Sequence, residues 1–336
     1  MRTRALGSGF TLLVACAMVA AACSSSAKSA APPTTPTTAS ATTPSTTPIH
    51  SAVAARVTPA CNHPHAPGQV AQSFTFQGKN RTYQLYVPPA YKGTARVPLV
   101  FDFHGFGSNA VRQMAYGNFK PEANANDFLI VAPDGQDSPG GRHFSFGTEA
   151  GLQNDLTMVQ SLLSHIEATL CVNASRVYAT GMSDGGAMTS LLACTAADKF
   201  AAFAPVAVII YCASAKSRAV PLISFNGTAD PVVPYNGGAV HCCGGIVLKS
   251  KPVAMADWAA HDHCNPKFTD KRLGSEVVRR TWTGCAKSST VVHYIIQGGG
   301  HTWPGSIPIP RLGLTTKQVD ASAEIWKFFS AYSLPG

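Results

Sequence analysis

Short apolar runs alternate along most of the chain with segments whose apolar residues follow helical spacing. The run 82–87 alternates with a period of two and ends at two prolines, which is typical of an outer antiparallel strand. Helical spacing is clearest over 155–170 and recurs over 321–332. Further buried strands are expected at 99–103, 128–132, 176–180, 203–208, 222–225 and 291–296. Strands interleaved with helices predict an α/β fold with a mostly parallel sheet covered on both faces.

The N-terminal part of the chain lacks this alternation. Two arginines precede an apolar run that is too short for a stable membrane span, so we predict a signal peptide over 1–22. Cys23 follows small residues, which predicts either lipid attachment at Cys23 and anchoring to the membrane, or release as a free secreted protein. Residues 23–60 are rich in Ser, Thr, Pro and Ala and are expected to form an unfolded tether. A single folded domain is then expected over 61–336.

The charge of the chain excludes one class of function. There are 26 Lys and Arg against 17 Asp and Glu, which gives a formal net charge of +9, and charged residues make up only 13% of the chain. No long basic block is present, so we expect no nucleic-acid partner. Modest attraction to an anionic cell envelope is the most that this charge supports.

The cysteines indicate an oxidising compartment. Eight of the ten follow the predicted tether, and an even number behind an export signal predicts disulfides. Two expected pairings close short loops and a third ties down the entry strand; they are Cys264–Cys285, Cys194–Cys212 and Cys61–Cys171. Cys242 and Cys243 are left either to bridge each other or to pair elsewhere. The His- and Cys-containing segments 241–243 and 261–264 lack a zinc spacing, so no metal is expected.

Residues 181–186 read Gly-Met-Ser-Asp-Gly-Gly and lie between a predicted strand and a helical stretch. Gly-x-Ser-x-Gly in this setting is the pattern of the nucleophile elbow of α/β-hydrolases, and it makes Ser183 the candidate nucleophile. The sharp turn strains the serine backbone. Small residues two before and two after the serine prevent collisions with the neighbouring strand and helix.

A serine nucleophile needs a base, and the base needs a carboxylate to orient it. In α/β-hydrolases these residues occur in the order Ser, acid, His. Asp230 and His301 each follow a predicted strand in that order, so we predict Asp230 as the acid and His301 as the base. Asp102 is an alternative acid, but it precedes Ser183 and lies within a predicted strand.

The tetrahedral intermediate needs backbone N–H donors for its oxyanion. Asp184, directly after the nucleophile, is expected to supply one of them. Phe106, in the loop 104–107 after an early strand, is expected to supply the other. His104 is predicted to hold this loop by hydrogen bonding and not to act as a base.

Five motifs stand out along the predicted domain: Phe-His-Gly-Phe-Gly (103–107), Ala-Pro-Asp-Gly (132–135), Gly-Met-Ser-Asp-Gly-Gly-Ala-Met (181–188), Asn-Gly-Thr-Ala-Asp-Pro-Val-Val-Pro-Tyr (226–235) and Gly-Gly-Gly-His-Thr-Trp-Pro-Gly (298–305). Together they resemble the secreted polyhydroxybutyrate depolymerase and feruloyl esterase family over roughly 61–333. The resemblance implies an α/β-hydrolase fold, a Ser183–Asp230–His301 triad and ester hydrolysis without a cofactor. With its leader, the chain looks like an actinobacterial cell-envelope version.

Departures from the family refine this expectation. Many relatives carry Asn where this chain has Asp184. Family depolymerases of solid polymer often carry a further substrate-binding domain, and its absence from the pattern favours small or soluble esters. Phe106 and Val232 are expected in the substrate pocket. Trp303 is expected either to form a pocket wall or to be structural.

We therefore expect a secreted serine esterase, free or anchored through Cys23, whose partner is a small or oligomeric ester of short-acyl, hydroxyalkanoate or feruloyl type. Two alternatives stay open. One is an envelope acyltransferase, similar to mycolyltransferases, that uses the same triad. The other is a non-catalytic lipoprotein that binds envelope components.

Overall fold

The structure is a computed structural model that describes residues 61–146, 151–213, 217–242 and 246–335. The predicted signal peptide, the lipid site at Cys23 and the tether lie outside the described residues, as does Cys243, so these remain predictions. Within the described ranges, no helix combines the length and apolar character that a membrane span requires.

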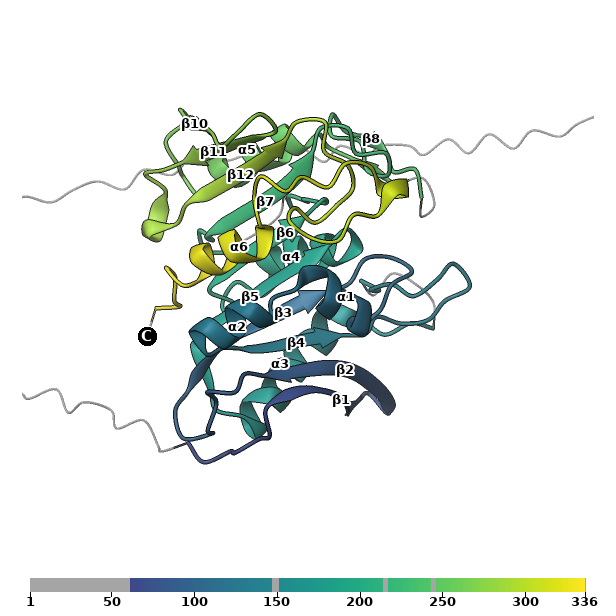
Figure 1. Ribbon diagram of the computed structural model, residues 1–336, viewed down its shortest axis with the longest axis vertical. Helices are drawn as coiled ribbons and strands as arrows, with labels where there is room; N and C mark the ends of the chain where they lie inside the picture. Colours follow the sequence, from purple (N-terminus) through teal and green to yellow (C-terminus); the bar gives the residue numbers. More distant parts are fainter. Residues whose placement is uncertain (1–60, 147–150, 214–216, 243–245, 336) are drawn as a thin grey trace, which may run out of the picture. The chain divides into compact units, whose positions relative to one another are not determined.

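A ten-stranded mixed sheet forms the centre of the described part of the chain (Figure 1). Its order is β1-β2-β4-β3-β5-β6-β7-β12-β11-β10. The strands are β1 (Gly68–Phe76), β2 (Lys79–Val87), β3 (Val97–Phe103), β4 (Leu129–Pro133), β5 (Val172–Met182), β6 (Ala202–Val206), β7 (Leu222–Gly227), β10 (Thr269–Arg272), β11 (Val277–Trp282) and β12 (Val291–Ile296). Strands from β4 through β12 in this order pair in parallel. The mostly parallel sheet is therefore confirmed.

Antiparallel strands extend this parallel centre at both edges. β2 pairs with β4 and β1 pairs with β2, while β11 pairs with β12 and β10 with β11. The strand predicted at 82–87 is thus antiparallel as expected, but it lies second from the edge because β1 covers it. A separate small ladder joins β8 (Gly238–Ala239) to β9 (Val247–Leu248).

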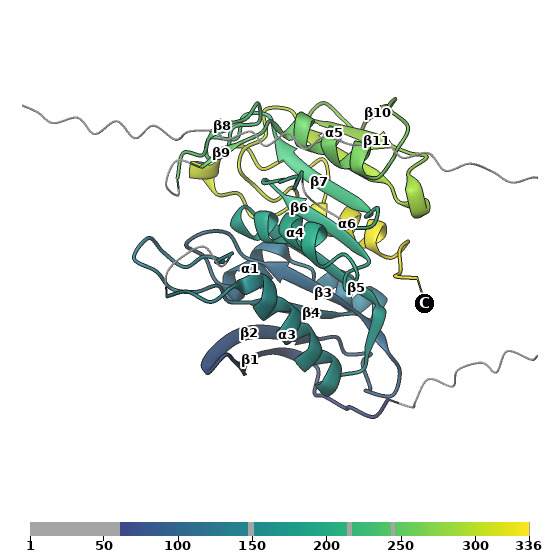
Figure 2. The same ribbon diagram turned by 180° about the vertical axis from the view of Figure 1, so that it is seen from behind.

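Helices cover both faces of the sheet, as the alternating pattern predicts. Figure 1 shows α1 (Ala110–Gly117), α2 (Lys120–Asn126) and α6 (Ala321–Phe329) in front of the sheet. Figure 2 shows α3 (Asp155–Thr169), α4 (Asp184–Thr195) and α5 (Lys251–His261) on the opposite face. Each face has its own apolar cluster, and alternate residues of β3 enter the two clusters: Phe101 packs with the α3 side and Val100 with the α1 side. Both faces of the central strands are buried, which explains their continuous apolar runs.

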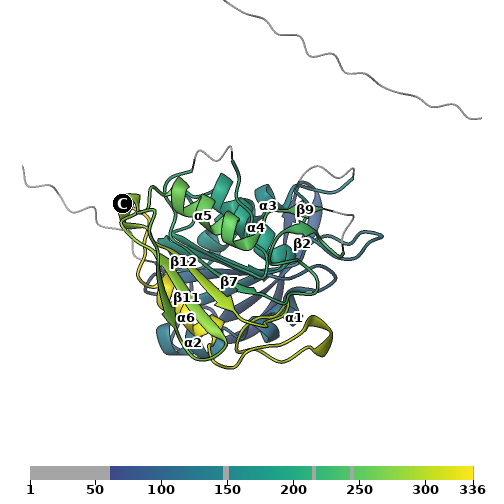
Figure 3. The same ribbon diagram turned by 90° about the horizontal axis from the view of Figure 1, so that it is seen from above.

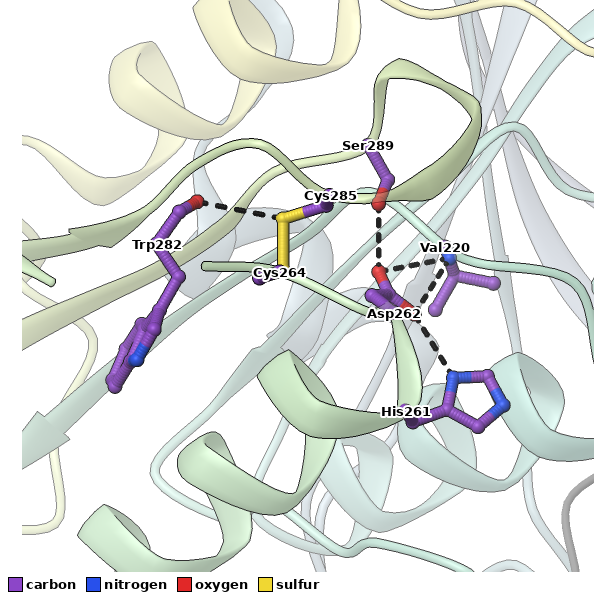
Figure 4. The surroundings of a disulfide bond; sticks show 7 residues. All are labelled: Val220, His261, Asp262, Cys264, Trp282, Cys285 and Ser289. Atoms are coloured by element: carbon purple, nitrogen blue, oxygen red, sulfur yellow. Dashed lines mark hydrogen bonds and ion pairs between the residues drawn. A yellow bond between two sulfur atoms is a disulfide. The ribbon is translucent and has the colours of Figure 1, made fainter. Parts of the chain in front are cut away.

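Three disulfides join cysteines among the described residues, and all three pairings expected from the sequence are confirmed: Cys61–Cys171, Cys194–Cys212 and Cys264–Cys285. Figure 4 shows the third bond beside the buried carboxylate of Asp262. That carboxylate accepts hydrogen bonds of 2.9–3.0 Å from three donors: the N–H of Val220, the hydroxyl of Ser289 and Nδ1 of His261. Cys264, His261 and Asp262, weighed as metal ligands, therefore have structural partners.

His293 on β12 gives the fold a sensitivity to acid. Its side chain is fully buried. Burial, with help from the positive charges of Arg280 and Lys251, lowers the pKa of His293 from 6.5 to about 3, although Asp270 opposes this. Between these two values the unfolded chain binds a proton that the folded chain does not. The contribution of His293 to the free energy of unfolding should therefore fall as the pH drops from 6.5 toward 3, by up to about 1.4 kcal/mol per pH unit.

We predict that His293→Phe removes most of this pH dependence. Phenylalanine keeps an aromatic ring beside Tyr235, which stacks on His293 at 6.1 Å between ring centroids, but it binds no proton. Urea unfolding of the wild type and the variant between pH 7 and pH 4 measures the effect. His63→Gln, which replaces an exposed histidine, is the control and should keep the wild-type slope. An unchanged slope in His293→Phe would contradict the prediction.

Candidate active site

Ser183 lies at the junction between β5 and α4, in the strand–turn–helix setting that its motif predicts. Its backbone has φ 57° and ψ −112°, a conformation that non-glycine residues rarely adopt. The junction is held by two hydrogen bonds of 2.9 Å: the Ser183 N–H donates to the carbonyl of Val206, and the Ser183 carbonyl accepts from the N–H of Ala187. The strained serine is thus fixed between β6 and the first turn of α4.

The glycines on either side of Ser183 allow this turn. A Cβ on Gly185 would lie 2.1 Å from the carbonyl oxygen of Phe103, on the adjacent strand β3. A Cβ on Gly181 would lie 2.6 Å from the carbonyl oxygen of Gly185. Real Cβ atoms do not approach backbone this closely, so helix α4 packs against β3 only because both positions lack side chains.

Asp230 and His301 meet in the loops that follow two neighbouring strands, β7 and β12. The side-chain oxygen Oδ2 of Asp230 lies 2.7 Å from Nδ1 of His301, and both residues are buried. The other oxygen, Oδ1, accepts 2.8 Å hydrogen bonds from the N–H groups of Val232 and Val233. A carboxylate held in this way accepts a hydrogen bond from Nδ1 and leaves Nε2 as the basic nitrogen of the imidazole.

Glycines also bring these two loops together. A Cβ on Gly227, the last residue of β7, would lie 2.2 Å from the carbonyl oxygen of Gly299. Gly300 packs as tightly against Leu312, and the N–H of His301 donates a 2.7 Å hydrogen bond to the Leu312 carbonyl. The backbone around His301 is thus tightly packed, as its three preceding glycines suggest.

A pocket of about 510 Å³ lies over Ser183 and His301, which both line it. Phe106 and Val232, predicted from the sequence to contact substrate, line it too. Further apolar or aromatic lining comes from Met182, Tyr116, Ile307, Ile309 and Leu312. The structure therefore brings the candidate nucleophile, the candidate base and an apolar surface to one cavity, a common arrangement for small-molecule sites.

The loop predicted to bind the oxyanion is held by His104, as expected. Nδ1 of His104 lies 2.8 Å from the carbonyl oxygen of Gly105, and Nε2 accepts a 2.9 Å hydrogen bond from the N–H of Gly135. Burial lowers the pKa of His104. A neutral imidazole with both nitrogens engaged is a structural group, and it fixes the loop that carries Phe106 beside Ser183.

Asp184 begins helix α4 directly after Ser183. Its Oδ2 accepts a 2.8 Å hydrogen bond from the N–H of Phe144, so this carboxylate binds a neighbouring loop. Asp184 does not line the pocket. The backbone N–H groups of Asp184 and Phe106 stay candidates for the oxyanion site.

Asp102, the alternative acid, has no contact with His301 in the structure. It is buried on β3, where Oδ1 accepts a 2.7 Å hydrogen bond from the side-chain amide of Gln113 on α1. Burial raises the pKa of Asp102 well above its ordinary value, and the Gln113 bond only partly offsets this. His301 is oriented by Asp230 instead.

Trp303 was expected either to form a pocket wall or to be structural, and the structure places it in the core. The indole is buried in the core, packs edge-on against Phe119 at 5.8 Å between ring centroids, and donates a 3.0 Å hydrogen bond to Ser322. It does not line the pocket. Its assignment to substrate binding is therefore wrong, because two residues beyond His301 the chain has already turned into the core.

Several residues that line the pocket were not singled out from the sequence. Arg112, Gln113 and Tyr116 come from α1, which has no recognised motif. Ile309 and Arg311 come from the loop after β12, whose residues show no periodicity. Cys242 also lines this pocket. Across the ranges that the structure describes, no three His, Cys, Asp or Glu side chains are grouped to hold a metal ion.

Comparison with known proteins relates this chain to esterases. Residues 81–242 match the family model described as Esterase PHB depolymerase. The chain is 29% identical to feruloyl esterase B of Piromyces equi over 64% of its own length, but it spans only 41% of that protein. It is 27% identical to a probable feruloyl esterase C of Aspergillus flavus, covering 75% of this chain and 84% of that one.

Solved structures agree on the fold. The acetyl xylan esterase of Aspergillus awamori superposes with a TM-score of 0.54 at 15% identity, over 78% of this chain and 99% of that one. A thermostable esterase gives the same TM-score at 18% identity, over 79% and 63% of the two chains. Such similarity shows the α/β-hydrolase fold. The chain thus has the α/β-hydrolase fold, and its residues 81–242 match the Esterase PHB depolymerase domain.

Proposed function

We propose that this chain is an exported serine esterase with Ser183 as nucleophile, His301 as base and Asp230 as the orienting acid. The observation that carries the proposal is the buried 2.7 Å contact between Asp230 and His301, at a pocket that Ser183 also lines. The three confirmed disulfides fit an oxidising, extracellular environment.

In the proposed reaction, Oγ of Ser183 attacks the ester carbonyl carbon while Nε2 of His301 takes the hydroxyl proton. The negative oxygen of the tetrahedral intermediate accepts hydrogen bonds from the backbone N–H groups of Asp184 and Phe106. The ester C–O bond then breaks, and His301 returns the proton to the leaving alcohol. A water molecule, deprotonated by His301, then attacks the acyl carbon; the bond to Oγ of Ser183 breaks, His301 returns the proton to Oγ, and the acid is released. Asp230 keeps Nδ1 protonated throughout and stabilises the imidazolium.

The substrate that fits this pocket is a small or oligomeric carboxylic ester. A cavity of about 510 Å³ lies in the usual range for small-molecule sites and has an apolar lining for an acyl chain or an aromatic acid. The names of the relatives point to feruloyl and acetyl esters, and the family name to hydroxybutyrate esters. We therefore propose short-acyl, hydroxyalkanoate or feruloyl-type esters.

The test is to label the purified protein with a fluorophosphonate and to locate the adduct by peptide mass spectrometry. We expect one phosphonylated peptide, modified at Ser183, and a parallel loss of p-nitrophenyl butyrate hydrolysis. Methyl ferulate and 3-hydroxybutyrate oligomers, offered to the unlabelled enzyme, then identify the preferred ester. An unlabelled Ser183 together with no hydrolysis of any of these esters would overturn the proposal. Acyl transfer to an added sugar in preference to water would replace hydrolysis by an acyltransferase reaction.

A further inference from the structure

Two arginines line the pocket of Ser183, and they come from distant parts of the sequence. Arg112 lies on α1, and Arg311 lies in the short 3-10 turn Pro310–Leu312 after β12. Figures 1 and 3 show the loop after β12 near helix α1, and residues of both segments line the same pocket. One cavity therefore has a cation on each of two separate segments.

Neither guanidinium has a partner among the described residues. Only the backbone N–H of Arg112 is hydrogen-bonded, to the capping residue Asn109, and no ion pair or side-chain hydrogen bond involves Arg112 or Arg311. By contrast, Arg142 pairs with Asp134 and Asp137, and Arg280 pairs with Asp270. The two pocket arginines are thus available to a ligand.

The rest of the lining leaves these positive charges uncompensated. No Asp or Glu is among the described residues that line the pocket. The nearby carboxylates are engaged elsewhere, because Asp230 binds His301 and Asp184 accepts a hydrogen bond from Phe144. Apolar side chains, among them Phe106, Val232 and Ile309, supply much of the remaining surface, together with uncharged polar residues such as Ser108 and Gln113. The pocket combines an apolar body with a cationic rim.

We propose that the preferred substrate is an ester that carries a carboxylate, held by Arg112 and Arg311 while Ser183 attacks the ester carbonyl. This inference rests on the proposed function. Arginine forms paired hydrogen bonds with carboxylates, and an apolar cavity reduces the competition from water. The carboxylate belongs either to the acyl part, as in a half-ester of a dicarboxylic acid, or to the alcohol part, as in an acylated hydroxy acid.

The test compares esters that differ only in charge. For the acyl side, the pair is p-nitrophenyl hydrogen adipate and the same ester with a terminal carboxamide. For the alcohol side, it is O-acetyl-3-hydroxybutyrate and its carboxamide. We expect kcat/KM to favour the carboxylate by about 10-fold in one pair, since two exposed ion pairs of modest strength act together. The preference should shrink in 0.5 M NaCl because salt screens exposed charges.

Variants separate the pocket arginines from general surface charge. In Arg112→Gln with Arg311→Gln, the carboxylate-to-carboxamide ratio should fall to about one, mainly through a rise in KM for the carboxylate. Arg272→Gln removes the same charge from an exposed arginine on β10, outside the pocket, and should keep the wild-type ratio.

Three outcomes would overturn the inference. A wild-type ratio of one or less in both pairs, with normal hydrolysis of p-nitrophenyl butyrate, would reject the anionic substrate and leave the esterase assignment intact. A ratio that survives the double substitution would place the recognition outside Arg112 and Arg311. Absence of hydrolysis of every ester, neutral or charged, would reject the esterase assignment itself and this inference with it.

Discussion

Ser183→Ala should lower kcat for p-nitrophenyl butyrate hydrolysis by about 10⁵-fold or more, since the acyl-enzyme cannot form without the hydroxyl. The fold should survive, because the variant removes one oxygen from a pocket-lining side chain and keeps its backbone. Long-time assays of the purified variant measure the residual rate, and circular dichroism verifies the fold. A rate within 10-fold of the wild type would exclude Ser183 as the nucleophile.

The second prediction compares two buried carboxyl groups, those of Asp230 and Asp102. Asp230→Asn should cost about 10⁴-fold in kcat, because an amide cannot keep Nδ1 of His301 protonated and aligned. Combining it with Ser183→Ala should cost no more than Ser183→Ala alone, since the residues act as a unit. Asp102→Asn is the control: this buried carboxyl has a raised pKa, and an amide oxygen in its place can also accept the hydrogen bond from Gln113. It should stay within a few-fold of wild-type activity. The reverse result would make Asp102 the acid.

The sequence predicted the central strands well because burial on both faces leaves a strong signal. β12 has the bounds predicted for it, and α3 differs by one residue at its end. Strand β6 ends at Val206, two residues early, because Ala207 adopts a φ of 64° that no strand continues. The φ of Ala207 depends on packing against the turn at Ser183, whose N–H donates to the carbonyl of Val206. The local sequence of β6 therefore does not predict where the strand ends.

The edges of the fold were missed for a physical reason. All four residues of β10 are exposed, so no apolar alternation marks this strand, and only its pairing with β11 defines it. Helix α2 buries a single residue, Ala123, and therefore lacks an amphipathic pattern. Elements that are held by neighbours and not by a buried face of their own leave little trace in the sequence.

The candidate site also has a part that the sequence predicted and a part that it did not. Ser183, Asp230 and His301 were predicted because the proposed chemistry demands particular residue types in a particular order after strands. The pocket walls carry no such demand: Arg311 and Ile309 lie in a loop whose path is fixed by long-range contacts, such as the hydrogen bond of His301 to Leu312. The pocket walls, which determine substrate preference in the proposed function, are therefore the part of the site that is hardest to predict from the sequence.

Gly185→Ala should destabilise the protein strongly, although it adds a single methyl group. The new Cβ would lie 2.1 Å from the carbonyl oxygen of Phe103, 2.5 Å from its carbonyl carbon and 2.8 Å from its Cβ. Phe103 is fully buried on β3, so it cannot move away, and α4 is fixed by the hydrogen bonds of Ser183. We expect a loss of about 4 kcal/mol or more in the free energy of unfolding, with little soluble protein recovered.

Gly140→Ala is the matched control for this substitution. A Cβ at Gly140 would meet only the ring of Phe106 at 3.7 Å and the hydroxyl of Ser138 at 3.8 Å, which are ordinary contacts. Its backbone is not in the left-handed region, so alanine is expected to leave the urea unfolding midpoint close to that of the wild type. Comparable midpoints for Gly185→Ala and Gly140→Ala would mean that α4 can shift away from β3. The turn at Ser183 would then be held by its hydrogen bonds alone, and the close approach of helix and strand would not be what fixes the nucleophile.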